Sequence, residues 1–221
     1  MTNEETQGRP SRPTLNAPHI AQMALALIDA EGLDAFSMRK LGAALEVDPM
    51  AVYHYFPNKA ALFDAIVEAI YTQIDTSVAV AAEWDEAVAT YMHAMRNAMR
   101  THPHALSLVA TRPVNTAPVL VLVEVLVARL TRAGAAPTEA LAMVNCFGTF
   151  TIGHLLADVG APVGGPEGPP PDATILDASA IPTLAAAMAA GWVFDPDAQF
   201  DLGLRAMIAG FGAHYGLRDP N

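Results

Sequence analysis

Apolar residues recur at helical spacing along most of the chain, and no stretch shows a clear alternation of period two. The pattern predicts three short helices and one longer helix before residue 80. Residues that favour helix N-caps precede these four helices, at Asn16, Ser37, Asp48 and Asn58. Beyond residue 80, further helical segments are predicted near 84–101, 104–110, 116–133, 138–159, 181–191 and 197–215.

One apolar segment, VLVLVEVLV (119–127), has the β-branched composition of a strand. Its length and the lack of a partner strand favour a buried helix instead. Residues 160–171 contain nine Gly or Pro in twelve positions, which predicts a loop. The expected fold class is therefore all-α. The expected organisation is a flexible arm (1–14), a three-helix domain (15–62) and a second helical domain (63–221) that contains a loop over 160–180.

Composition and charge restrict the function. Hydrophobic residues make up 52% of the chain, and the formal net charge is −11. An acidic protein does not hold nucleic acid by a bulk positive field, so any DNA contact must come from a few well-placed groups. The single cysteine, Cys146, forms no internal disulfide, which suits a reducing cytoplasm. The apolar run 117–130 is interrupted by Glu124 and Arg129, so we expect no membrane span.

The segment VDPMAVYHYFPNK (47–59) concentrates rings and polar groups on one short predicted helix. Val52 and Phe56 are four residues apart and can pack inward, which leaves the other side chains on outer faces. The preceding helix is joined to this one by about three residues, the spacing of a helix-turn-helix. Exposed rings and a small residue fit the major groove of DNA. For Tyr53 and for Tyr55, packing against neighbouring helices remains an alternative.

The same region resembles a known family. The segments EGLDAFSMRKLG, AVYHYFPNK and AALFDAI, within residues 15–66, are similar to the N-terminal domain of the TetR family of bacterial transcriptional repressors. The resemblance implies an all-helical homodimer that binds a palindromic operator through a helix-turn-helix domain. It also implies a C-terminal domain that dimerises and binds a small-molecule inducer. It places Tyr53 and Lys59 at phosphate-contacting positions, and Pro49, Met50, Ala51 and Tyr55 in the groove.

Basic residues flank the predicted recognition helix and can hold the DNA backbone on either side. The complete set of predicted DNA-binding residues is Arg39, Lys40, Pro49, Met50, Ala51, Tyr53, His54, Tyr55 and Lys59.

The segments RTHPHALSLVATRPV and AMVNCFGTFTIGHLLADV are similar to parts of the tetracycline-binding members of this family, where they line the drug pocket. The resemblance places the magnesium-serving histidine and acid of those members at Leu108 and Ala157, and a drug-binding amide near Tyr91. Leucine and alanine side chains cannot ligate a metal. We therefore expect an unknown, mostly apolar effector, no metal and no cofactor.

The predicted ligand-binding residues combine apolar and polar side chains. Met92, Met95 and Met99 follow helical spacing and suit either core packing or an adaptable apolar pocket. On the predicted helix 138–159, one face combines apolar and polar side chains, as expected for a ligand cavity, and carries Phe147, Thr151, His154 and Asp158. Of these four, His154 either faces the ligand or lies in the core or a subunit interface. The complete set is Tyr91, Met92, Met95, Arg112, Phe147, Thr151, His154 and Asp158.

Helices 138–159 and 197–215 are the expected homodimer pair. Gly203, Gly210 and Gly212 are costly within a helix, so they indicate either close approach of another backbone or a bent helix. Cys146 is expected to be a small buried hydrophobe rather than a reactive thiol.

Two other functions compete with a DNA-binding regulator. His93, His102 and His104 are candidate ligands of a metalloenzyme, but Pro103 interrupts them and no helical HxxxH accompanies them, so the chain is not expected to be an enzyme. The remaining alternative is a helical ligand-binding or adaptor protein without DNA binding.

Overall fold

The computed structural model describes residues 15–75, 83–112, 116–160 and 179–218, and every regular element in these ranges is a helix. The predicted all-α fold class is thus confirmed. The chain divides into two compact units, Met1–Ile66 and Val67–Asn221. The predicted arm over 1–14 and most of the predicted loop over 160–180 lie outside the described residues.

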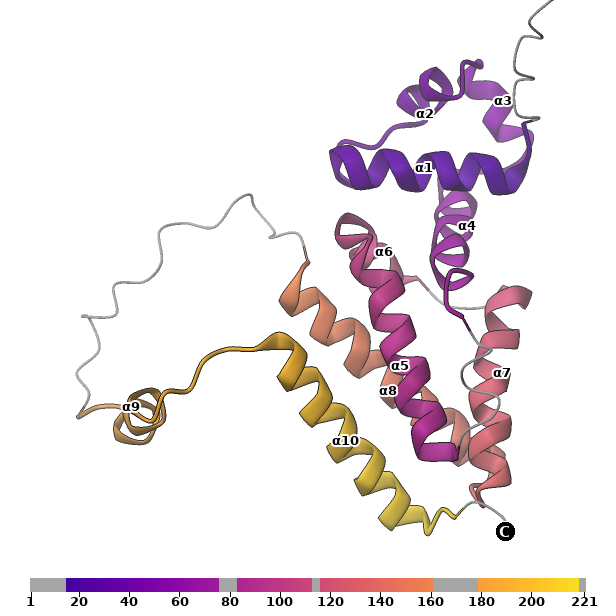
Figure 1. The fold of residues 1–221 in the computed structure, drawn as a ribbon. Coiled ribbons are helices and arrows are strands. Elements are labelled where there is room, and N and C mark those ends of the chain that lie inside the picture. The colour runs from indigo at the N-terminus through magenta and orange to yellow at the C-terminus, as the bar shows by residue number, and fades with distance from the viewer. Residues whose placement is uncertain (1–14, 76–82, 113–115, 161–178, 219–221) are drawn as a thin grey trace, which may run out of the picture. The chain divides into compact units, whose positions relative to one another are not determined.

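The first unit is built from α1 (Ala17–Glu31), α2 (Met38–Ala44), α3 (Pro49–Tyr53) and the first part of α4 (Lys59–Tyr71) (Figure 1). All four predicted N-caps are confirmed. Their side-chain oxygens accept from backbone N–H groups two or three residues ahead, at 2.8–3.3 Å. Gly32 ends α1 at a φ of 85°, a conformation that glycine adopts without strain.

The core of the first unit is formed by fully buried aliphatic side chains from all four helices, and these are Ile20, Ile28, Leu41, Val52, Leu62 and Ile66. Because α2 and α3 are too short to be stable alone, their positions depend on this shared core and on their caps.

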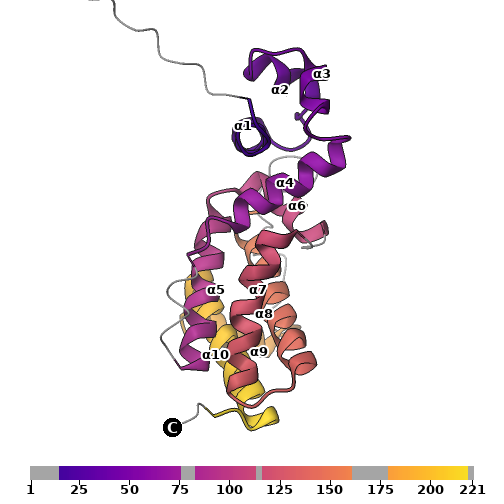
Figure 2. The same cartoon turned by 90° about the vertical axis from the view of Figure 1, so that its right-hand side faces the viewer.

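The second unit contains α5 (Trp84–Arg100), the short 3₁₀ turn η2 (Pro103–Ala105), α6 (Leu106–Thr111), α7 (Ala117–Arg132), α8 (Pro137–Asp158), α9 (Pro182–Ala189) and α10 (Pro196–Tyr215). Each predicted helical segment is present, and α7 confirms that VLVLVEVLV is helical. Helix α8 packs against α5, α6, α7 and α10 (Figures 1 and 2).

Two glycines of α10 lie against aromatic rings of the same chain. A Cβ at Gly203 would lie 2.5 Å from the Cζ of Phe150 on α8. A Cβ at Gly212 would lie 3.0 Å from the Cζ2 of Trp84 on α5. No heavy atom of the described residues, beyond the helix's own backbone, lies within 4 Å of a Cβ built at Gly210.

Two further observations concern α8. Cys146 is exposed, so the prediction of a buried thiol is wrong for the single chain, because Cys146 lies beside, not on, the buried face that carries Phe147 and Thr151. Among the described residues, α8 is the one helix long and apolar enough to cross a bilayer. Because α8 packs against four other helices, its length and composition are only weak evidence for a membrane span.

Candidate nucleic-acid interface and interior cavity

Helix α3 buries one side and exposes the other. Val52 is fully buried and Phe56 is 7% exposed, as predicted, whereas Met50 is 65%, Tyr53 38% and Tyr55 42% exposed. His54 is also exposed, and Ala51 is partly exposed. The first unit therefore presents a side of α3 and of the turn after it, hereafter the exposed side of α3, that carries an apolar chain, two phenol rings and an imidazole.

The approach of α2 to α3 depends on Gly42. A Cβ at this position would lie 3.0 Å from Pro49 Cγ, Pro49 N and Val47 O. Two of these three atoms belong to the backbone and cannot turn aside. Gly42 thus sets how closely α3 packs on α2.

The two tyrosines near the end of α3 differ in their contacts. The Tyr55 hydroxyl donates to the backbone carbonyl of Leu15 at 2.9 Å, which ties the end of α3 to the residue before the α1 cap. This bond supports the packing alternative for Tyr55, although its ring is partly exposed. Tyr53 is exposed without such a tether in the first unit's described residues, so its hydroxyl is available to a phosphate.

The three predicted cations differ in the same way. The Lys59 ammonium lies over two rings, 5.4 Å from the centroid of Phe36 and 5.0 Å from that of Phe63, an arrangement that directs the charge without burying it. Lys40 forms an ion pair with Glu31 in which both side chains are exposed, so a phosphate would have to compete with that carboxylate. Arg39 is exposed near the start of α2.

The second unit contains a cavity of about 300 Å³ between α5, α6, α7 and α8, hereafter the interior cavity, which is also reached by Tyr71 at the end of α4 and is open to solvent beside the exposed residues Asn145 and Thr149. Four predicted ligand-binding residues line it: Tyr91, Met92, Met95 and Arg112. Burial raises the pKa of Tyr71 and of Tyr91 to about 12, so both phenols stay protonated at neutral pH.

The other four predicted ligand residues do not line this cavity. From α8 the cavity takes the neighbouring face, with Val144, Asn145, Gly148, Thr149 and Ile152. Phe147 and Thr151 are fully buried, and the Thr151 hydroxyl donates to the Phe147 carbonyl at 2.9 Å and lies 3.6 Å from Met92 Sδ. The sequence pattern thus predicted that the face of α8 with Phe147 and Thr151 lines the cavity, but this face packs inside the second unit.

His154 and Asp158 belong to a charged cluster that the sequence did not reveal. Arg96 on α5 is buried, and its guanidinium lies 3.3 Å from Asp158 at the end of α8 and 2.7 Å from Asp197 in the first turn of α10. Arg100 contacts the same two carboxylates at 3.8 and 3.0 Å. The Arg96 guanidinium also lies 4.9 Å from the centroid of Phe200. The cluster therefore joins three helices.

His154 is set against this cluster. Its ring lies 5.4 Å from that of Phe200 and 6.0 Å from that of Phe150, and its buried Nδ1 has no hydrogen-bond partner among the described residues. Burial lowers the pKa of His154 below its usual value of 6.5, and the charge of Arg96 lowers it further, against the opposing pull of Asp158 and Asp197.

This shift gives a pH-dependent prediction. Because the folded state resists protonating His154, the unfolded state binds more protons below pH 6.5, and stability is lost as the pH falls from there. His154→Asn should therefore reduce the dependence of the urea midpoint on pH between about 5 and 7, the range in which histidines titrate. The exposed His54→Asn variant is the control. An unchanged slope in His154→Asn would contradict this role.

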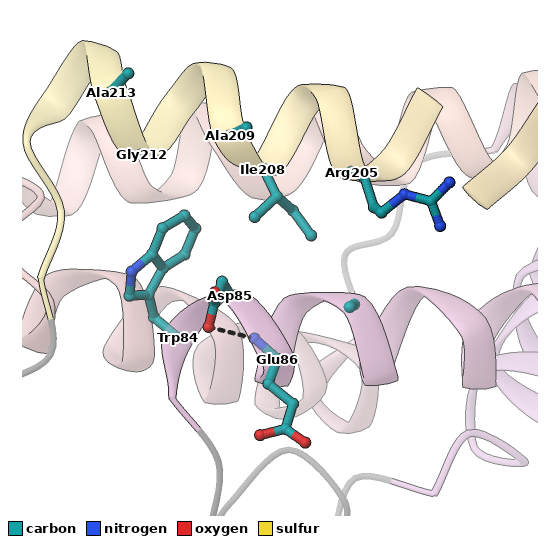
Figure 3. A pocket seen from close by; sticks show the side chains of 9 residues that line it. Trp84, Asp85, Glu86, Arg205, Ile208, Ala209, Gly212 and Ala213 are labelled. Carbon is teal, nitrogen blue, oxygen red and sulfur yellow. Dashed lines mark hydrogen bonds between the residues drawn. The ribbon is translucent and has the colours of Figure 1, made fainter. Parts of the chain in front are cut away.

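A second hollow, of about 400 Å³, lies on the surface between α5 and α10. Figure 3 shows the Trp84 ring directed toward α10 beside Gly212, and Ile208 directed toward α5. Asp85 accepts from the backbone N–H of Glu86 at 2.7 Å, within the first turn of α5. The hollow is thus a gap between side chains of two packed helices, α5 and α10. No group of three or more potential metal ligands occurs in the described part of the chain.

Each of the two units matches a known protein family. Residues 20–66 match the family described as bacterial regulatory proteins, tetR family, and residues 80–215 match the tetracyclin repressor-like C-terminal domain. An HTH-type transcriptional regulator of Saccharopolyspora erythraea is 27% identical over 70% of this chain, and the match spans 65% of that protein. The class A tetracycline repressor of Escherichia coli is 29% identical, over 86% of this chain and 88% of the repressor.

Solved structures show the same architecture. A possible TetR family regulator from Streptomyces coelicolor A3(2) is 30% identical, with a TM-score of 0.76 over 90% of this chain and 99% of that one. ActR of Streptomyces coelicolor, solved in complex with actinorhodin, has the same fold at 24% identity and a TM-score of 0.77, over 91% and 99% of the two chains. This chain therefore belongs to the TetR family of bacterial regulatory proteins, which are DNA-binding transcriptional regulators and not enzymes.

Proposed function

We propose that this regulator is a ligand-responsive repressor that binds a palindromic operator as a homodimer in the cytoplasm. A small, mostly apolar effector occupies the interior cavity of the second unit and releases the DNA. The observation that carries the proposal is the exposed side of α3, held by the Asp48 cap and by close packing on Gly42.

The acidic character of the chain determines how it binds DNA. At a net charge of −11, non-specific attraction to phosphates is weak. Affinity then comes from a few contacts, of which the Tyr53 hydroxyl and the Lys59 ammonium are the best placed for phosphates. Met50 and Ala51 meet base edges in the groove.

Dimerisation through α8 and α10 is supported by apolar side chains that the single chain leaves in solvent. Leu141 and Leu156 on α8 are 45% and 38% exposed, and Leu202 on α10 is 64% exposed. Exposed leucines on two neighbouring helices indicate a surface that another subunit covers. In a twofold dimer, two α3 helices would read half-sites about one DNA turn apart, roughly 34–36 Å.

Release follows if the effector binds the DNA-incompetent dimer more tightly, since a ligand shifts a population only by its differential affinity. ActR, which is solved with actinorhodin, is a structural neighbour in which the same fold holds a small molecule. The interior cavity of this chain is the proposed counterpart.

Tyr53→Ala should weaken operator binding by about tenfold to a hundredfold, the size expected for one or two lost phosphate or base contacts. The measurement is fluorescence anisotropy with a duplex from the region upstream of the gene. Tyr53→Phe, which keeps the ring, should lose only the part due to the hydroxyl. If Tyr53→Ala binds as tightly as the wild type, Tyr53 does not contact the operator, and if the wild type itself does not bind the duplex, the adaptor alternative without DNA binding is favoured.

A further inference from the structure

The interior cavity is positively charged through a single side chain. Of its lining residues in the described part of the chain, Arg112 alone carries a charge at neutral pH, and none is an aspartate, glutamate or histidine. A cationic ligand here would lose part of its water without gaining a counter-charge, which costs free energy. The cavity likewise offers no carboxylate for a hard cation such as Mg²⁺.

The polar groups of the cavity are donors and neutral acceptors. Tyr71 and Tyr91 keep their hydroxyl protons, Asn145 offers an amide, and Thr149 offers a hydroxyl. Arg112 follows α6 directly as its C-cap residue. A guanidinium has five N–H donors in a planar fork, so Arg112 can bind a ligand oxygen while it keeps its other contacts.

The rest of the wall is apolar, with two phenol rings and two thioethers beside the aliphatic side chains of Val109, Ala110, Val123, Val144 and Ile152. The rings of Tyr71 and Tyr91 and the side chains of Met92 and Met95 favour contact with a flat aromatic system. The volume of about 300 Å³ is at the lower end of the range for ligand cavities, which favours a compact molecule.

Resting on the function proposed above, we propose that the effector is a compact aromatic acid, a carboxylate or phenolate, that binds without a metal ion and directs its anionic group to Arg112. Its ring system lies among Tyr71, Tyr91, Met92 and Met95. Asn145 and Thr149 bind further polar substituents.

The test uses three probes of similar size and different charge: 2-naphthoate, 2-naphthamide and 2-naphthylmethylammonium. Each is titrated into the DNA-free full-length protein by calorimetry, in EDTA and in Mg²⁺. We expect the carboxylate to bind most tightly, the amide about tenfold or more weaker, and the ammonium weakest, since charge-assisted bonds to Arg are strong. The affinities should be the same in EDTA and in Mg²⁺.

Two variants refine the test. Arg112→Met should reduce the affinity for the carboxylate to that for the amide and leave amide binding unchanged. Arg132→Met, at an exposed arginine at the end of α7, should change neither. The wild-type comparison of the three probes stands even if Arg112→Met does not fold.

The proposal is overturned if the ammonium binds as tightly as the carboxylate, if binding requires Mg²⁺, or if no probe binds at millimolar concentration. The function proposed above is tested separately with the operator duplex. If the carboxylate binds in calorimetry but releases no DNA in anisotropy, the ligand class stands and the release mechanism fails.

Discussion

Gly42→Val should abolish specific DNA binding while the second unit stays folded. The first added atom, Cβ, already meets Pro49 and the Val47 carbonyl at 3.0 Å, and the two methyl groups of valine extend further. Overpacking of this kind typically costs about 1–3 kcal/mol or displaces the backbone. Either result moves the exposed side of α3 out of register with the groove. We expect operator affinity to fall to the non-specific level, a loss of about a thousandfold or more.

Fluorescence anisotropy with the operator duplex measures this loss, and binding of 2-naphthoate in calorimetry reports whether the second unit is folded. Ala43→Val is the matched control, because it places the same side chain at an exposed position of the same helix. Gly42→Ala should fall between the wild type and Gly42→Val, since its single Cβ is only marginally too close. Wild-type operator affinity in Gly42→Val would show that α3 does not depend on this contact.

The second large effect is expected at Arg96. The side chains of Arg96 and Asp158 are 5% and 8% exposed, so removing the guanidinium leaves a buried carboxylate whose nearest remaining cation is Arg100, at 3.8 Å. Breaking a buried pair typically costs about 3–5 kcal/mol, and we expect Arg96→Met to lie near the lower limit because Arg100 remains. Urea unfolding followed by tryptophan fluorescence measures the effect, since both tryptophans, Trp84 and Trp192, belong to the second unit.

Two further variants decide whether the buried charge is the cause. The double variant Arg96→Met, Asp158→Asn removes both charges and should recover much of the loss. Arg205→Met, at an exposed arginine of α10, should unfold like the wild type. If the double variant is no more stable than Arg96→Met, lost packing on Phe200 is responsible and not the unpaired carboxylate.

The features that sequence reasoning predicted well are local. A helix cap is decided by residues two or three positions apart, and the caps at Asn16, Ser37, Asp48 and Asn58 all form as predicted. The inward packing of Val52 also follows from helical spacing alone. A long apolar segment with no partner strand was likewise sufficient to predict α7.

The features that were missed depend on residues far apart in the chain. Arg96 is 62 residues from Asp158, and no local pattern pairs them. On α8, two neighbouring faces both carry apolar and polar groups, and only the positions of α5, α6, α7 and α10 decide which face packs and which lines the cavity. Gly203 could be explained only when Phe150 was seen to occupy the space beside it.

The central claim is that the exposed side of α3 reads a symmetric DNA sequence. Selection of duplexes from a random pool by the purified protein, followed by sequencing, tests it most directly. We predict that the wild type enriches a twofold-symmetric motif with half-sites centred about one DNA turn, roughly 10 base pairs, apart, and that Tyr53→Ala and Gly42→Val enrich it weakly or not at all. If the wild type enriches no motif, or if both variants enrich the same motif as strongly, the claim is contradicted.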